Sequence, residues 1–157
     1  MNQKVLTVEG VAVDKLANSV GTPLMLYNER ALENRLAEFK QSFVHPDFET
    51  QIIYASKAFS CIEMLKLVKA ANAGLDVVSG GELAMAEHAD FPMKEIVFHG
   101  NNKTPSEIRQ AITLGVGNIV IDGVMEFEEV RRASHELKQK TPVILRVNPG
   151  IEADTHK

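Results

Sequence analysis

The sequence predicts an α/β protein built on a parallel β-sheet. Short apolar runs that suit strands begin near Ile52, Leu75, Ile96, Ile119 and Val143, at successive spacings of 23, 21, 23 and 24 residues. Helix-like segments fill the gaps between these runs. The runs mostly lack the in-out alternation of a half-exposed antiparallel sheet. Short apolar strands that alternate with helices are typical of βα units, whose strands pair in parallel.

The five expected strands are almost wholly apolar. They are QIIYA (51–55), GLDVV (74–78), EIVF (95–98), NIVI (118–121) and PVILRV (142–147). Continuous apolar runs of this length are typical of strands that are covered on both faces. We therefore expect Ile52, Ile53 and Tyr54 of the first run to be buried.

Five helices are expected, one ahead of the strand series and four within it. They cover residues 29–43, 61–71, 82–89, 105–114 and 125–138. Asn28 is a candidate N-cap of the first. Ser60, Ser79 and Thr104 each begin a Ser/Thr-x-x-Glu capping box, and Pro105 suits the first helical position. These boxes predict where three of the helices begin.

Two architectures satisfy this alternation of strands and helices. One is a (β/α)₈ barrel and the other is an open, doubly wound sheet. Five βα units suit an open sheet of flavodoxin-like type, and they are three units short of a barrel. The pattern alone leaves both open.

The composition limits the class of protein. The 157 residues are 45% hydrophobic and 24% charged, as in one globular domain. A net charge of −4 argues against nucleic acid as a partner, and no apolar run approaches the roughly 18 residues that a membrane span needs. The single cysteine, Cys61, excludes an internal disulfide framework and fits a reducing cytoplasm.

Polar side chains gather where the expected strands end, which is where parallel α/β proteins carry their sites. Lys57 follows the first strand, Asp76 lies in the second, His99 follows the third, Asp122 ends the fourth and Arg146 lies in the fifth. The charged groups in or beside apolar strands are the informative ones, because a charge there must be paired or used.

Lys57 is the sharpest candidate. Burial disfavours an ammonium group, and the free amine can attack a carbonyl and form a Schiff base. The structural alternative is a lysine that reaches solvent from a strand end. Asp76 would then pair with Lys57, and Arg146 with some other carboxylate.

Other polar groups near the strand ends have structural explanations as well. Glu82 fits the capping box that begins at Ser79, and His99 can hold a turn through its ring nitrogens. The N–H groups of Gly80 and Gly81 suit either an anion or a turn.

Four motifs together resemble a known family. YASKAF (54–59), GLDVVSGGEL (74–83), FHGNNKTPSEI (98–108) and LRVNPGIEADTHK (145–157) occur in this order. They resemble the N-terminal part of the diaminopimelate decarboxylases. These belong to the alanine-racemase-like group of pyridoxal-phosphate enzymes, which includes the ornithine decarboxylases. The resemblance begins at about Thr22.

The resemblance implies a partial (β/α)₈ barrel of about five βα units, in the fold-type-III class of pyridoxal-phosphate enzymes. Residues 1–24 would pack on a second, β-rich domain, and residues 25–157 would form an incomplete cofactor-binding barrel. Five of eight strands leave two hydrogen-bonding edges open. We therefore expect the chain to be a fragment of a longer polypeptide and to be inactive by itself.

The resemblance also assigns the candidate site. Lys57 matches the lysine that holds pyridoxal phosphate covalently, and it would be the catalytic residue. Asp76 matches a carboxylate close to the cofactor, and Glu82 matches an acidic position of the SGGE helix start. His99 matches a loop at the pocket mouth, and Arg146 matches an arginine near the cofactor ring.

The implied reaction is α-decarboxylation of meso-diaminopimelate to L-lysine, the last step of lysine biosynthesis. The substrate would be a small amino acid, and the full-length protein would be a cytoplasmic homodimer without a metal. Two alternatives of the same group stay open: a decarboxylase of another amino acid or polyamine precursor, and a non-catalytic homologue that binds pyridoxal phosphate. An unrelated five-stranded signalling or flavin domain lacks support, because no acidic cluster follows the first strand and no phosphate-binding loop is visible.

Overall fold

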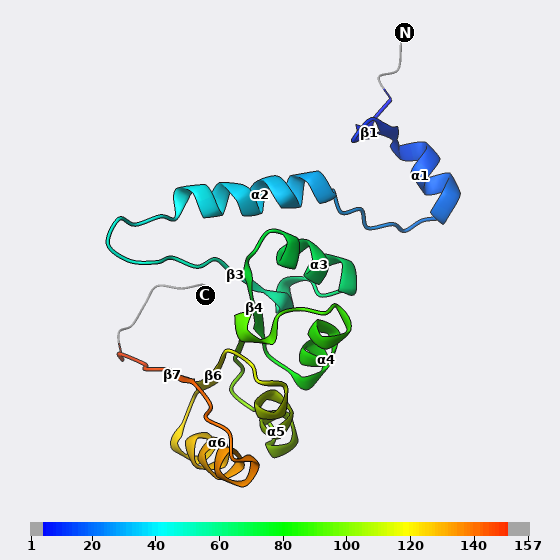
Figure 1. Ribbon diagram of the computed structural model, residues 1–157. Helices are drawn as coiled ribbons and strands as arrows, with labels where there is room; N and C mark the ends of the chain where they lie inside the picture. Colours follow the sequence, from blue (N-terminus) through cyan, green and yellow to red (C-terminus); the bar gives the residue numbers. More distant parts are fainter. Residues whose placement is uncertain (1–4, 151–157) are drawn as a thin grey trace. The chain divides into compact units, whose positions relative to one another are not determined.

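The computed structural model describes residues 5–150, which belong to two compact units (Figure 1). The first unit extends to Ser42 and the second begins at Phe43. The expected domain boundary after residue 24 stays a prediction, because it concerns packing on a further domain. In the part that the structure describes, no helix is long and apolar enough to cross a membrane.

The first unit begins with a small antiparallel hairpin that the sequence analysis did not predict. Its strands are β1 (Thr7–Val8) and β2 (Val11–Ala12), and the helix α1 (Val13–Val20) follows directly. Glu9 and Gly10 form the turn with φ angles of 48° and 78°. Two successive positive φ angles are typical of the turn that closes a two-residue hairpin. Strands of two residues are too short to show any periodicity in the sequence.

Helix α2 (Glu29–Ser42) ends the first unit and confirms the helix expected over residues 29–43. The Asn28 side-chain oxygen accepts a hydrogen bond from the Ala31 amide at 3.0 Å, so the expected N-cap is present. The Glu9 carboxylate accepts a hydrogen bond from the Asn28 side chain and pairs with Arg30 at 3.3 Å. These contacts tie the hairpin turn to the start of α2.

The second unit contains a five-stranded sheet in which every neighbouring pair is parallel. Its strands are β3 (Ile53–Ala55), β4 (Gly74–Val77), β5 (Ile96–Phe98), β6 (Asn118–Ile121) and β7 (Val143–Leu145). Their spatial order follows the sequence without a reversal. A doubly wound sheet has such a reversal, so the order excludes that architecture and identifies a section of a (β/α) barrel.

Four α-helices connect the strands and lie on one side of the sheet (Figure 1). They are α3 (Ile62–Ala70), α4 (Gly80–His88), α5 (Pro105–Leu114) and α6 (Val124–Leu137), and two short 3₁₀ turns, η1 (Ser56–Ala58) and η2 (Met93–Glu95), follow β3 and precede β5. All four helices were predicted, and α4 begins two residues earlier than expected.

The three predicted capping boxes have different outcomes. Thr104 forms the complete box with Glu107 at the start of α5. Ser79 caps α4 by accepting a hydrogen bond from the Glu82 amide at 3.3 Å. The box predicted at Ser60 is wrong, because Cys61 is the N-cap of α3 and makes no side-chain cap. Glu63 pairs with Lys66 instead, at 2.9 Å.

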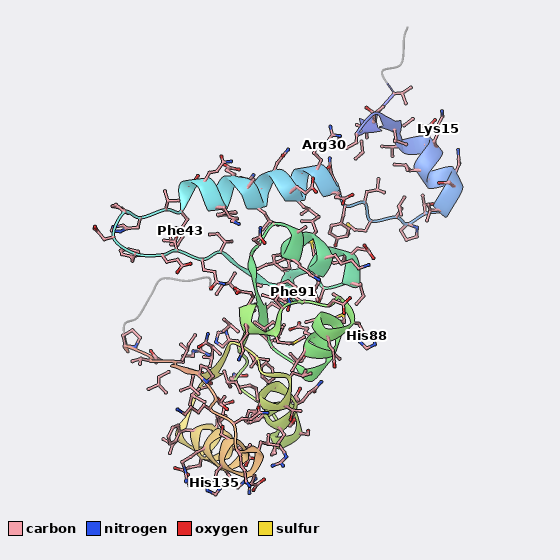
Figure 2. The ribbon with its side chains drawn as sticks, in the orientation of Figure 1. Lys15, Arg30, Phe43, His88, Phe91 and His135 are labelled. Carbon is pink, nitrogen blue, oxygen red and sulfur yellow. The ribbon has the colours of Figure 1, made fainter. Side chains whose placement is uncertain are left out.

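The core of the second unit lies between the sheet and these helices. Leu75 and Val77 of β4 are fully buried, as are Ile96 and Phe98 of β5. Phe91, labelled in Figure 2, closes this core at 3% exposure. Successive side chains of a strand point to opposite faces. The residues between the buried ones therefore face the side of the sheet away from the helices.

The outer strands are less buried than the sequence suggested. Ile53 is 40% exposed, and Ile52 and Tyr54 are only partly buried, so the expectation of a buried first strand is wrong. The reason is position: within residues 5–150, β3 and β7 each have one strand neighbour. Strand β7 also ends at Leu145, so Arg146 follows the strand and does not lie in it.

Candidate functional site

Asp76 occupies the centre of the candidate site. It lies between the buried Leu75 and Val77 on β4, so its side chain faces the side of the sheet away from the helices. The side chain is 20% exposed, and its Oδ1 atom is buried with no hydrogen-bond partner among the residues that the structure describes. Burial raises the pKa of Asp76, and the nearby charges of His99 and Lys57 only partly oppose this.

His99 follows β5 and stands next to Asp76. Its backbone N–H donates to the Val77 carbonyl at 2.8 Å, which places the residue beside the end of β4. Its Nδ1 is 3.7 Å from Asp76 Oδ1, which is too long for a hydrogen bond but close enough for an ion pair. Gly100 continues this turn with a φ of 91°, and a Cβ there would lie 2.8 Å from the Val78 carbonyl oxygen. Glycine is therefore required for the turn to pack against β4.

Lys57 lies in η1, directly after β3. The register pairs Ala55 with Asp76, and the Lys57 charge lowers the pKa of Asp76, so the two groups are near each other. Lys57 is nevertheless exposed, and the expected partial burial is wrong. The cause is that β3 is an edge strand here, so nothing in the described part of the second unit covers the residue that follows it.

Ser56 is a contributor that the sequence analysis missed. It is fully buried, and its hydroxyl donates to the Asp76 carbonyl at 2.8 Å. This bond joins η1 to β4 one residue before Lys57, so it fixes where the lysine leaves the sheet. A small hydroxyl residue next to a candidate lysine was the only available signal, and many loops contain one.

Glu82 closes the loop between β4 and α4. Its Oε2 accepts a hydrogen bond from the Val78 amide at 2.6 Å, and its charge contributes to the raised pKa of Asp76. The carboxylate thus lies close to the Asp76 group, but its described bond is to the backbone of its own loop. This contact supports a structural role for Glu82. The predicted role in cofactor binding stays a prediction.

The described contacts of Arg146 do not include Lys57, Asp76 or His99. Its Nη1 donates to Asp122 Oδ1 at 2.9 Å, as the structural alternative anticipated for this residue. Asp122 directly follows β6, and the Arg146 amide donates to the Ile121 carbonyl at 3.0 Å. The pair therefore lies at the carboxyl end of the sheet, two strands beyond Asp76.

The possible anion site at Gly80 and Gly81 is occupied by a side chain of this protein. Glu107 Oε1 accepts a hydrogen bond from the Gly80 amide at 2.7 Å, and Oε2 accepts one from the Thr104 amide at 2.9 Å. These two backbone bonds lower the pKa of Glu107. The carboxylate thus fills the place at this helix start that an external anion would take.

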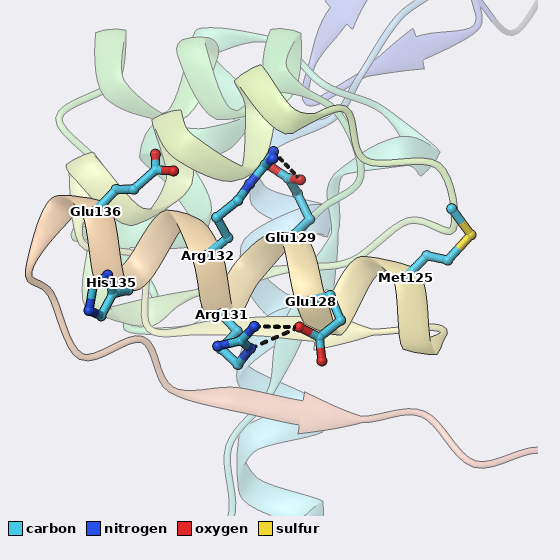
Figure 3. A pocket seen from close by; sticks show the side chains of 7 residues that line it. All are labelled: Met125, Glu128, Glu129, Arg131, Arg132, His135 and Glu136. Carbon is cyan, nitrogen blue, oxygen red and sulfur yellow. Dashed lines mark hydrogen bonds and ion pairs between the residues drawn. The ribbon is translucent and has the colours of Figure 1, made fainter.

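One hollow lies away from the strand ends and is lined mostly by charged side chains. A cavity of about 330 Å³ lies along α6 (Figure 3). Figure 3 shows Arg131 beside Glu128 and Arg132 beside Glu129, and in each ion pair the arginine neutralises the charge of its glutamate. A solvated charged helix face explains this hollow. Among residues 5–150, no three His, Cys, Asp or Glu side chains come together as metal ligands would.

The fold and the site together define a class of protein: a section of a (β/α) barrel that presents a lysine, a carboxylate and an imidazole at the carboxyl ends of its first three strands. The chain matches the family described as pyridoxal-dependent decarboxylase, pyridoxal binding domain, over residues 29–157. The chain belongs to this family, and pyridoxal phosphate is the cofactor of its domain.

Similar proteins agree with this assignment. The chain is 43% identical over 152 residues to a diaminopimelate decarboxylase of Staphylococcus aureus, which covers 97% of the chain and 35% of the relative. It is 42% identical over 151 residues to one of Halalkalibacterium halodurans, covering 96% of the chain and 34% of the relative. The chain therefore spans about a third of the length of these curated relatives.

Solved structures of the same kind share the fold. A diaminopimelate decarboxylase of M. jannaschii superposes with a TM-score of 0.86 at 32% identity, over 99% of this chain and 37% of that one. One from Helicobacter pylori, complexed with L-lysine, has a TM-score of 0.84 at 31% identity, over 91% and 36%. The expected partial barrel of fold type III is thereby confirmed.

The residues present fit one end of this cofactor. Pyridoxal phosphate carries an aldehyde, which a lysine amine can bind covalently. Asp76 has a buried carboxylate oxygen that lacks a hydrogen-bond partner among residues 5–150, and the Lys57 charge acts on this carboxyl group. An ammonium proton or a cofactor donor would satisfy that oxygen. The described residues thus supply a covalent attachment point and an acceptor beside it.

Proposed function

We propose that the chain binds pyridoxal phosphate through Lys57 and serves the decarboxylation of meso-diaminopimelate to L-lysine. The observation that carries the proposal is the buried Oδ1 of Asp76, which has no hydrogen-bond partner in the described structure and lies within the influence of the Lys57 charge. A buried acceptor without a donor is costly, and such groups concentrate at functional sites.

Each candidate residue has a role in this proposal. Lys57 provides the amine that binds the cofactor. The Asp76 carboxylate accepts a hydrogen bond from that amine and so orients it, and the His99 Nδ1 atom lies 3.7 Å from Oδ1 of the same carboxylate. When bound, the cofactor acts as a sink for the electron pair that remains at the α-carbon as carbon dioxide leaves.

Glu82 and Arg146 take supporting roles. Glu82 keeps the loop after β4 closed through the Val78 amide. Arg146, oriented by Asp122, adds a positive charge at the same edge of the sheet. A cation there would favour the anionic groups of the cofactor or substrate.

The choice of substrate rests on the degree of similarity. Curated relatives at 42–43% identity are diaminopimelate decarboxylases. Lysine/ornithine decarboxylase structures are 17–18% identical, which supports the shared fold alone. We therefore favour meso-diaminopimelate over another amino acid. A cytoplasmic location remains part of the proposal and is supported by the single cysteine, Cys61. A homodimer of the full-length protein is proposed from the family resemblance.

The proposal predicts the behaviour of a spectral titration with pyridoxal phosphate. Wild-type chain should change the cofactor spectrum in a saturable way, and Lys57→Ala should not. Lys57 is exposed, so its removal should change the free energy of unfolding by no more than about 0.5 kcal/mol. Lys66→Ala is the matched control, because Lys66 is also exposed and lies nearby in sequence on α3.

Substrate preference is read from the same titration. Added meso-diaminopimelate should displace the Lys57 signal at lower concentration than ornithine does. Equal displacement by both would remove the substrate assignment and leave cofactor binding intact. A saturable change of the cofactor spectrum with Lys57→Ala, equal to that with the wild type, would refute the attachment itself.

A further inference from the structure

A buried lysine joins the loop that follows β5 to the first turn of α6. The Lys103 side chain has no exposed surface, and its Nζ lies 2.8 Å from Glu126 Oε1, whose side chain is 13% exposed. The same Nζ donates to the Gly100 carbonyl at 2.5 Å and lies 5.7 Å from the centre of the Phe98 ring. A buried ion pair contributes little net stability, so stability alone does not explain this pair. We therefore consider whether it positions the residues to which it is bonded.

Each end of this pair bonds a residue that is next to, or bonded to, a candidate site residue. On one side, Lys103 holds the carbonyl of Gly100, the residue directly after His99. Gly100 is also pressed against the Val78 carbonyl, so the turn has little freedom to move in that direction.

On the other side, Glu126 Oε2 accepts a hydrogen bond from the Asp122 amide at 2.7 Å. Asp122 in turn binds Arg146 at 2.9 Å. The series from Gly100 through Lys103, Glu126 and Asp122 therefore connects the His99 turn with the arginine beyond β7. No other described ion pair links the loop after β5 to the first turn of α6.

We propose that Lys103 and Glu126 are a positioning pair, which holds the His99 turn and the Asp122–Arg146 pair in fixed register at the cofactor site. This inference rests on the proposed function. A site holds its ligand well when the groups behind it are themselves locked by hydrogen bonds and packing. The pair touches neither Lys57 nor Asp76 in the described contacts, so it acts through the turn and through Asp122.

The test separates positioning from simple stability with two variants. Lys103→Met removes one charge and leaves Glu126 buried without its partner, so this protein should be less stable. Lys103→Met with Glu126→Gln removes both charges and keeps an acceptor for the Asp122 amide. Its resistance to urea should return close to that of the wild type. Arg109→Met is the control, because Arg109 of α5 also pairs with a glutamate of α6, Glu136, but is 44% exposed.

The first measurement needs no cofactor. Amide hydrogen exchange of His99, whose N–H bonds the Val77 carbonyl, should be about tenfold faster in the double variant than in the wild type, and unchanged in Arg109→Met. Unchanged exchange in the double variant would overturn the proposal whatever the cofactor does.

The second measurement is the apparent affinity for pyridoxal phosphate. It should fall about tenfold in the double variant, the lower end of what lost supporting contacts cost a metal site. Affinity that recovers together with urea resistance would mean that the pair is only structural, and the proposal would fail. Wild-type protein that does not bind the cofactor would refute the proposed function, and the exchange data would still decide whether the pair holds the turn.

Discussion

At the scale of single residues, Asp76 shows how the pleat of a strand places a charge. Leu75 and Val77 enter the core, so Asp76 between them must face the other side of the sheet. The sequence alone was enough to predict an unusual carboxylate in an apolar strand. It was not enough to predict the neighbour, because His99 reaches Asp76 only through the parallel pairing of β4 with β5.

The raised pKa of Asp76 predicts a stability effect. The pKa of this carboxyl group is higher in the folded than in the unfolded protein. The protein therefore becomes less stable as the pH rises from the unfolded pKa to the folded pKa. Asp76→Asn should therefore stabilise the ligand-free chain by about 1 kcal/mol at pH 7, in the range usual for stabilising substitutions. Urea unfolding at pH 7 and at pH 3 measures this.

The advantage of Asp76→Asn should vanish at pH 3, where the wild-type carboxyl is protonated. Asp90→Asn is a suitable control, since Asp90 is exposed and outside the site. A loss of stability in Asp76→Asn at pH 7 would mean that the carboxylate is a structural ion-pair member.

At the scale of elements, three helices of the barrel section use a glutamate in their first turn in the same way. Glu82, Glu107 and Glu126 each accept a hydrogen bond from a backbone N–H of the loop that precedes their helix. The capping-box pattern predicted the Glu107 bond, but Glu82 bonds the Val78 amide in place of the Ser79 amide, and Glu126 follows Gly123 and so matched no box. The pattern failed at Ser60, because the N-cap of α3 is Cys61, one residue after Ser60. Glu63 forms an ion pair with Lys66 instead.

Glu107 supports a prediction at this scale. Its carboxylate bonds the Thr104 and Gly80 amides, so Glu107→Gln should lower the free energy of unfolding by about 1 kcal/mol at pH 7. Its pKa is lowered in the folded protein, so this contribution is present above the unfolded pKa and is lost as the pH falls through the folded pKa. Urea unfolding of both proteins across acidic pH should show the difference shrinking.

Glu63→Gln is the matched control for that experiment. Glu63 holds the same place in a Ser-x-x-Glu sequence but pairs only with Lys66 on the helix surface. It should change the free energy of unfolding by less than about 0.5 kcal/mol. Equal losses in both variants would contradict the capping explanation.

At the scale of the whole molecule, the sequence predicted that the strands are parallel. Periodicity alone did not decide between a barrel and a doubly wound sheet. The repeat of strand and helix is the same in both, and only the spatial order of the strands separates them. The exposure of the outer strands also escaped the sequence analysis, because an apolar run does not reveal whether a neighbour covers it. Lys57 is exposed for the same reason.

The open edge at β7 predicts self-association of this chain. Among residues 5–150, β7 has one strand neighbour, and its Ile144 and Leu145 are 44% and 65% exposed. Such an edge is a surface that other strands can pair with. Leu145→Lys should reduce the concentration dependence of the mass seen by light scattering. Val20→Lys, which changes an apolar residue that is 70% exposed at a helix end, should leave it unaltered. Monomeric wild-type chain at every concentration would contradict this prediction.

The central claim is that one amine of the chain is set apart by its place beside a buried carboxylate. It is tested most directly by adding a limiting amount of pyridoxal phosphate, reducing with borohydride and locating the label by peptide mass spectrometry. The account predicts that the label lies on Lys57 and falls sharply in Asp76→Asn, while Lys66 and the other exposed lysines stay nearly free of it. Label spread evenly over the lysines, or an unchanged amount on Lys57 in Asp76→Asn, would contradict it.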